Sequence, residues 1–209
     1  MMEIIPSIIA GNFDEVREKI ARVENLVDWV ELDVMDGAFV PNVTWQTPDD
    51  LKSLTGQTKL SAHLMTVAPE TIAEDWQEVT DRIIVHLEAI NDLDGLIERQ
   101  SPHCPLGVAL NLITPVEKVF PYLDQIKWVQ LMSIARTGFG DEPFDNRVLT
   151  KIEILKNERP EIKLIVDGGI NLIVAQELMA SGVDALVIGS QIWGAADPAQ
   201  AIQDFQALS

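Results

Sequence analysis

The sequence predicts an α/β protein, a single-domain (β/α)8 TIM barrel with a parallel eight-stranded core that spans residues 1–209. Short apolar, β-branched runs alternate with amphipathic segments along the whole chain, which is typical of a parallel sheet with right-handed crossovers. Eight such units in 209 residues fit the compact end of the barrel size range. A doubly wound sheet is the alternative. Its central strands are usually uninterrupted Val, Ile and Leu runs, whereas several strands here carry polar residues near their C-terminal ends.

Each expected strand is a run of five to seven mostly apolar residues bounded by turn-forming or polar residues. The eight runs are residues 3–9, 29–35, 59–65, 82–88, 106–111, 128–134, 162–168 and 185–189. Helical periodicity occurs between them at residues 13–26, 69–80, 93–100, 115–123, 146–158, 172–181 and 198–208, with only a weak pattern near 49–54. No linker, low-complexity tract or change of composition marks a second domain.

Composition limits the possible partners. The net charge of -18, from 33 acidic and 15 basic residues, disfavours nucleic acid and an anionic membrane surface as partners.

Cys104 is the only cysteine, so an internal disulfide is excluded and a reducing, cytoplasmic location is expected. The N-terminal segment lacks a basic region and its apolar run is broken by Pro6, which indicates a first strand and not a signal peptide. No stretch approaches the roughly 20 apolar residues of a membrane span.

The stretch VELDVMDGAFVPN, residues 30–42, combines a buried-strand pattern with carboxylates. Side chains alternate along a strand, so Glu31, Asp33 and Met35 share one face and the intervening apolar residues share the other. A buried ionised carboxylate is unfavourable unless it is paired or binds a metal. The acidic face therefore indicates a functional site, and an edge strand with one wet face is the alternative.

In a barrel, the residues of one strand face point inward and catalytic groups collect at the C-terminal strand ends. The inward residues near those ends are Ser7, Glu31, Asp33, Met35, His63, Met65, His86, Met132 and Asp167. Asp33 and Asp167 lie on the second and seventh strands, on separate arcs of the ring, which suits two-base proton transfer beside a carbonyl. Together with Glu31 and His63 they form a plausible ligand set for a divalent cation such as zinc, iron or manganese.

Motifs along the chain resemble one enzyme family. PSIIAGNF, ELDVMDGAFVPNVT, HLM, VHLEA, GVALN, TP, a Met-led loop ending in GFGDEPF, VDGGIN and VIGSQIWG follow in the order of the motifs of the ribulose-phosphate 3-epimerase family. The resemblance covers essentially the whole chain. It implies a (β/α)8 barrel of the pentose phosphate pathway that inverts C3 of a ketopentose 5-phosphate through a cis-enediolate.

The resemblance also implies roles for individual residues. Asp33 and Asp167 would be the acid/base pair, and Glu31, Asp33, His63 and Asp167 would hold the metal. Met35, Met65 and Met132 would line the substrate pocket and Ser7 would bind a substrate hydroxyl, with barrel filling and a buried structural serine as the alternatives. His86 would support the metal ligands without being one.

Two departures from the family pattern matter. Glu31 stands where the family usually has histidine, which shifts the expected metal from zinc toward manganese, iron or magnesium, or leads to loss of the metal. The loop MSIARTGFGDEPF, near the family pattern MTVNPGFGGQ(x)F, gains a residue, loses NPG and places Asp141 where a glycine normally contacts the phosphate. Arg136 would then supply a phosphate ligand beside Gly138 and Gly140, or the substrate differs from the usual one.

The remaining phosphate-binding elements are glycine-rich. Gly168 and Gly169 follow the seventh strand, and Gly189 and Ser190 follow the eighth, where backbone amides can bind an anion; tight turns are the alternative reading. The sequence therefore predicts a metal-assisted epimerase, a homo-oligomer, acting on a small phosphorylated ketose. The alternatives are an epimerase of another ketose, such as a ketohexose 6-phosphate, and a non-catalytic phosphosugar-binding protein.

Overall fold

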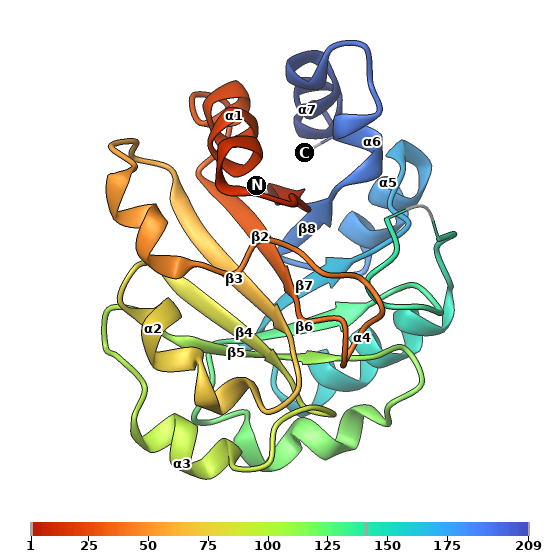
Figure 1. The fold of residues 1–209 in the computed structure, drawn as a ribbon. Helices are drawn as coiled ribbons and strands as arrows, with labels where there is room; N and C mark the ends of the chain where they lie inside the picture. Colours follow the sequence, from red (N-terminus) through yellow and green to blue (C-terminus); the bar gives the residue numbers. More distant parts are fainter. Residues whose placement is uncertain (1, 141, 209) are drawn as a thin grey trace.

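Eight parallel strands close into a barrel in the computed structural model, which describes residues 2–140 and 142–208. Each strand pairs with its sequence neighbour, and β8 pairs with β1. The strands are β1 Glu3–Ile8, β2 Trp29–Met35, β3 Lys59–Met65, β4 Arg82–His86, β5 Leu106–Leu110, β6 Trp128–Met132, β7 Lys163–Asp167 and β8 Ala185–Ile188. The predicted (β/α)8 barrel is confirmed, and helices surround the ring of strands (Figure 1).

Helices and short helical turns follow most strands. They are α1 Phe13–Val23, η1 Pro48–Ser53, η2 Pro69–Thr71, α2 Ala73–Gln77, α3 Leu93–Glu98, η3 Val116–Tyr122, α4 Arg147–Glu158, α5 Leu172–Ala180, α6 Ser190–Trp193 and α7 Pro198–Gln206. Polar caps fix several N-termini: Asn12 accepts from the amide of Glu15, and Asn171 and Asp197 cap α5 and α7 in the same way. None of the described helices is long and apolar enough to cross a membrane.

Two of the expected helices are wrong in extent or type. The segment predicted as one helix over residues 69–80 is the 3-10 turn η2 followed by the five-residue α2, and Ile72 before α2 offers no side-chain acceptor for a cap. The segment predicted as a helix over residues 115–123 is a 3-10 helix that contains Pro121. Proline lacks an amide donor and clashes with the preceding turn of an α-helix, which explains the difference.

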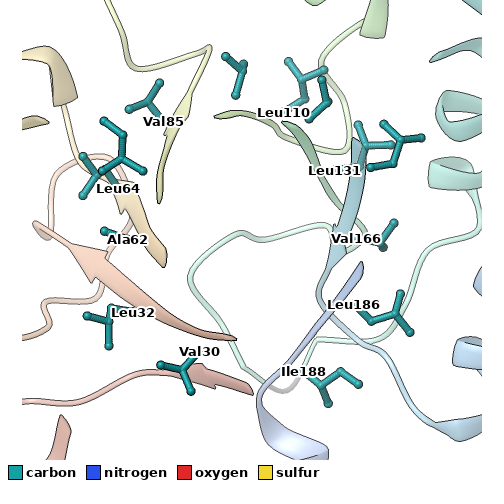
Figure 2. Close-up of a cluster of buried hydrophobic side chains, with 14 of the residues drawn as sticks. Val30, Leu32, Ala62, Leu64, Val85, Leu110, Leu131, Val166, Leu186 and Ile188 are labelled. Atoms are coloured by element: carbon teal, nitrogen blue, oxygen red, sulfur yellow. The ribbon is translucent and has the colours of Figure 1, made fainter. Parts of the chain in front are cut away.

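The two faces of the strands bury different sets of side chains. Outward-facing residues such as Val30, Leu32 and Leu186 belong to a large apolar cluster, and Figure 2 shows them spread around the ring of strands. The interior contains a smaller apolar cluster formed by Ile5, Ile84, Ala109, Ile165, Ala185 and Val187. β2 pairs with β1 and β3, so the alternative of an edge strand with a wet acidic face is excluded.

Candidate functional site

Four polar side chains from β2, β3 and β7 surround one point near the C-terminal end of the barrel. Nδ1 of His63 lies 3.2 Å from Oδ1 of Asp33, 3.6 Å from Oδ2 of Asp167 and 3.7 Å from Oε1 of Glu31. One potential ligand atom from each of the four residues lies within 4.8 Å of all the others. The register Asp33↔His63 on β2 and β3 sets this proximity. The structure therefore brings together all four side chains that the sequence predicted as metal ligands.

A chain of hydrogen bonds orients His63 from behind. Nε2 of His63 lies 2.9 Å from Nε2 of His86, and Nδ1 of His86 lies 3.2 Å from Oε2 of Glu88. Burial lowers the pKa of His86 to about 4, so this imidazole is neutral at physiological pH. Burial acts to raise the pKa of Glu88, but hydrogen bonds from His86, Thr114 and the Asn111 amide lower it to about 2.

These protonation states fix the direction of each hydrogen bond. Because Glu88 is ionised, Nδ1 of His86 donates to it and Nε2 of His86 accepts. Nε2 of His63 must then be the donor toward His86, which directs Nδ1 of His63 into the acidic cluster. A carboxylate behind a histidine pair is a common way to orient a metal-binding imidazole. The expectation that His86 supports the cluster without joining it agrees with this geometry.

The cluster attracts positive charge. Burial acts to lower the pKa of His63, but the hydrogen bond with Asp33 and the charges of Glu31, Asp33 and Asp167 raise it to about 9. Burial raises the pKa of Asp167 well above its usual range, and the charge of Asp33 raises it further. The site can therefore hold protons on His63 and Asp167, or a cation among the four residues.

Glu31, which is fully buried, accepts hydrogen bonds from two other strands and lies near an arginine on a third. Nε2 of Gln130 lies 2.8 Å from its Oε1, and Oγ of Ser61 lies 2.9 Å from its Oε2. Nη2 of Arg82 is 3.8 Å from the same Oε2. Burial raises the pKa of Glu31, while His63 and Arg82 act to lower it. One carboxylate oxygen thus faces the cluster and the other faces the donors beneath it.

A cavity of about 240 Å³ lies above the cluster at the C-terminal mouth. Most of the predicted substrate residues line it: Ser7, Asp33, Met35, Met65, Met132, Gly138, Gly140, Asp167, Gly168, Gly169, Gly189 and Ser190. Gly189 permits close packing here, since a Cβ at this position would lie 2.7 Å from Oγ of Ser7. Glu31 and His63 are fully buried and are not part of the cavity wall.

Arg136 is placed differently from the other predicted substrate residues. It is not among the residues that line the cavity; its guanidinium forms an ion pair with Glu142 and lies 4.6 Å from the ring centroid of Phe139. Its proposed contact with phosphate stays a prediction. Asp141, which was expected to replace a phosphate-contacting glycine, lies outside the described residues.

Two residues of the site were missed in the sequence. Gln130 donates to Glu31 and also, at 3.3 Å, to Oδ2 of Asp167; its position two residues before Met132 could have placed it on the inward face. Lys19 of α1 lines the cavity, donates to the carbonyl of Ile9 at 2.7 Å and lies 5.5 Å from the ring centroid of Trp193. A lysine on an amphipathic helix carries no signal of this kind, because only the tertiary fold places it at the mouth.

The fold and the cluster define a (β/α)8-barrel enzyme whose carboxylates and imidazole meet at the C-terminal mouth of the barrel. The chain belongs to the Ribulose-phosphate 3 epimerase family, whose model matches residues 3–193. The predicted resemblance to that family, and with it the expectation of an isomerase-class carbohydrate epimerase, is confirmed.

Individual relatives support this assignment. The Oryza sativa subsp. japonica protein "Ribulose-phosphate 3-epimerase, cytoplasmic isoform" is 32% identical over 208 residues, covering 96% of this chain and 91% of the relative. The Arabidopsis thaliana protein "Ribulose-5-phosphate-3-epimerase, chloroplastic" is 35% identical over 217 residues, covering 98% and 76%. Among solved structures, 3-hexulose-6-phosphate synthase from Salmonella typhimurium shares the fold with a TM-score of 0.76 at 14% identity, covering 99% of this chain and 98% of that one.

Proposed function

We propose that this protein inverts C3 of a phosphorylated ketose and interconverts ribulose 5-phosphate and xylulose 5-phosphate. The observation that carries the proposal is the position of Asp33 and Asp167, which come from β2 and β7 and both line the floor of the mouth cavity. The names of the family and of its relatives support the same reaction. Retention of both aspartates argues against a non-catalytic phosphosugar-binding protein.

The two aspartates would exchange one proton each with the substrate. One carboxylate removes the proton from C3, the electron pair moves into an enediolate across C2 and C3, and the other carboxyl returns a proton to the opposite face of C3. In one direction of the reaction Asp33 would be the base and Asp167 would return the proton. Burial and the charge of Asp33 raise the pKa of Asp167, which favours a proton on this carboxyl when no cation is bound. The roles reverse in the reverse reaction.

A divalent cation fits the cluster. Three carboxylates and Nδ1 of an oriented imidazole lie within 4.8 Å of one another, and these are ligand types for zinc, iron, manganese or magnesium. Glu31, Asp33, His63 and Asp167 would hold the ion, and the ion would polarise the two substrate oxygens that become the enediolate. Three carboxylates with one imidazole favour manganese, iron or magnesium over zinc.

The phosphate group is proposed to bind at the other end of the cavity. The residues that line the cavity include Gly168, Gly169, Gly189 and Ser190, and backbone amides in such turns can bind anions. Lys19 supplies a cation beside them, and no carboxylate lies within 4.0 Å of its Nζ in residues 2–140 and 142–208. In a chain of net charge -18, this local arrangement supplies the attraction that the overall charge does not.

Three methionines separate the reacting carbon from water. Met35, Met65 and Met132 line the cavity and are at most 2% exposed. An apolar wall strengthens the electrostatic interactions of the aspartates by excluding water. Ser7 also lines the cavity and is 5% exposed, and its hydroxyl is proposed to bind a substrate hydroxyl.

The aspartates provide the test of the reaction. Asp33→Asn and Asp167→Asn should each lower turnover of ribulose 5-phosphate by about 10² to 10⁴, because an amide cannot exchange the proton. In deuterated solvent the wild type should incorporate deuterium at C3 of the product. The exposed Asp49→Asn is the control. A variant at either catalytic position that retains full activity would remove that residue from the acid/base pair.

Metal dependence is tested separately. Elemental analysis of the purified protein should find about one divalent ion per chain, and chelation should abolish activity that manganese, iron, magnesium or zinc then restores to different extents. Activity that is indifferent to chelators, in protein without stoichiometric metal, would contradict the metal assignment. It would leave the acid/base assignment open to the Asp→Asn test.

A second candidate substrate is another phosphorylated ketose, such as a ketohexose 6-phosphate. The loop after β6, which departs from the expected family pattern, favours this second substrate, because Arg136 in that loop forms an ion pair with Glu142. Comparison of kcat/KM for pentulose and hexulose phosphates decides between them. A homo-oligomeric state stays a prediction, which sedimentation of the purified protein tests. A cytoplasmic location also stays a prediction, since the relatives include one named as a cytoplasmic isoform and one named as chloroplastic.

A further inference from the structure

A second cavity, of about 670 Å³, lies at the end of the barrel opposite the catalytic mouth. The first residues of seven strands contribute to its wall, and we call it the basal cavity. These seven are Glu3, Trp29, Lys59, Arg82, Trp128, Lys163 and Ala185, and Lys127 and Asp184 lie beside them. The residues that line it are not shared with the catalytic cavity.

The wall contains alternating cations and indole rings. The guanidinium of Arg82 lies 4.4 Å from the ring centroid of Trp29 and 5.1 Å from that of Trp128. Nζ of Lys59 lies 5.3 Å from the Trp29 ring, and Nζ of Lys127 lies 4.8 Å from the Trp128 ring. Contact with an aromatic face stabilises a cation and restricts its position without neutralising its charge. Three positive charges are therefore held in one wall.

Carboxylates balance only part of this charge. Asp184 already binds both Lys163, at 2.7 Å, and Lys156, at 3.1 Å. Among residues 2–140 and 142–208, no carboxylate oxygen lies within 4.0 Å of the amine of Lys59 or Lys127. Glu3 also lies in the wall, and its charge acts on Arg82 and Lys163. Four cationic and two carboxylate side chains thus line the basal cavity, which has a net positive charge in a chain whose net charge is -18.

Arg82 adds a positive charge to the wall of the basal cavity, but Glu31 in the barrel interior partly offsets that charge. The Arg82 side chain is 1% exposed, yet its Nη2 makes no hydrogen bond in the described residues. The nearest carboxylate is that of Glu31, 3.8 Å away. An unsatisfied buried guanidinium group is unfavourable. Even when Arg82 is assigned to Glu31 as its counter-ion, the two lysines remain without one.

We propose that the basal cavity binds a compact anion that carries a phosphoryl or pyrophosphoryl group. Arginine can bind phosphate oxygens through its planar fork, and lysines add charge without demanding a fixed geometry. The volume is adequate for a small phosphorylated molecule. The site is separate from the proposed phosphate position at the mouth, which lies at the opposite ends of the strands.

Inorganic pyrophosphate is the probe, titrated into the whole protein by calorimetry. Lys59→Ala combined with Lys127→Ala should weaken its binding by roughly tenfold for each lysine removed. Lys52→Ala combined with Lys118→Ala is the matched control, because both lysines are exposed and the change in net charge is the same. Arg82 is left intact because it also contacts Ser61 and Glu31.

A third variant, Lys19→Ala, separates the two cavities. Pyrophosphate binding to the basal cavity should persist in it, and saturating ribulose 5-phosphate should not compete. The proposal is overturned if the wild type does not bind pyrophosphate, if the Lys59 and Lys127 substitutions act no more than the control pair, or if Lys19→Ala abolishes binding. The last result would assign the anion to the catalytic mouth. Thermal unfolding of each variant shows that the fold is retained.

Discussion

Replacement of Glu88 by glutamine should change how the stability of the protein depends on pH. The carboxylate accepts hydrogen bonds from Nδ1 of His86 and from the amide of Asn111, and these lower its pKa from 4.5 to about 2. A group whose pKa is lowered by folding stabilises the folded state above its unfolded pKa. That contribution is lost as the pH falls toward the folded pKa.

The size of the effect follows from the shift. Each pKa unit is worth about 1.4 kcal/mol, so the lowered pKa sets an upper limit of about 3 kcal/mol of unfolding free energy at neutral pH. Glu88 is partly exposed, and solvent screening reduces this value, so a loss of roughly 1–2 kcal/mol is expected between about pH 6 and about pH 3. Glu88→Gln has no charge to lose and should lack this component.

The loss of unfolding free energy between the two pH values can be measured by urea unfolding followed by circular dichroism. Carboxylates distant from Glu88 contribute equally to the wild type and the variant, so the difference between their pH dependences reports on Glu88 together with its hydrogen-bond partner His86. Glu98→Gln, at the exposed end of α3, is the control and should show the wild-type pH dependence. If Glu88→Gln loses as much stability on acidification as the wild type, the orientation of His86 and His63 by an ionised Glu88 is refuted.

Two further predictions concern the substrate cavity. Lys19→Ala should raise KM for ribulose 5-phosphate roughly tenfold with little change in kcat, as loss of uniform binding does, and Lys19→Arg should restore KM; a fall in kcat alone would contradict a role in phosphate binding. Gly189→Ala should displace Ser7, because the new Cβ would lie 2.7 Å from its Oγ, and cost about 1–3 kcal/mol. Gly11→Ala, whose Cβ meets nothing closer than 3.9 Å, is the control in thermal unfolding and KM measurements.

Strand alternation was the most informative feature of the sequence. Because side chains alternate along a strand, Glu31 and Asp33 were placed on the same face of β2. Buried carboxylates have few structural explanations, so this face was recognised as a functional site. Helix extents were less predictable, since the turn at η3 depends on Pro121 inside an otherwise helical pattern. Lys19 could not be recognised at all, because its position on α1 is compatible with an exposed residue until the packing of α1 over the mouth is known.

Glu31 stands where the resemblance to the family leads us to expect histidine, and side chains on three other strands surround it. A carboxylate at this fully buried position adds negative charge; Gln130 and Ser61 donate hydrogen bonds to it and Arg82 supplies a positive charge 3.8 Å away. Arg82 in turn lies between Trp29 and Trp128 at the base of the barrel. A lone substitution at position 31 would leave an uncompensated charge, so these residues must be considered as one unit. With Glu31 surrounded from below, the carboxyl groups that line the cavity are those of Asp33 and Asp167, the two groups proposed to move the proton.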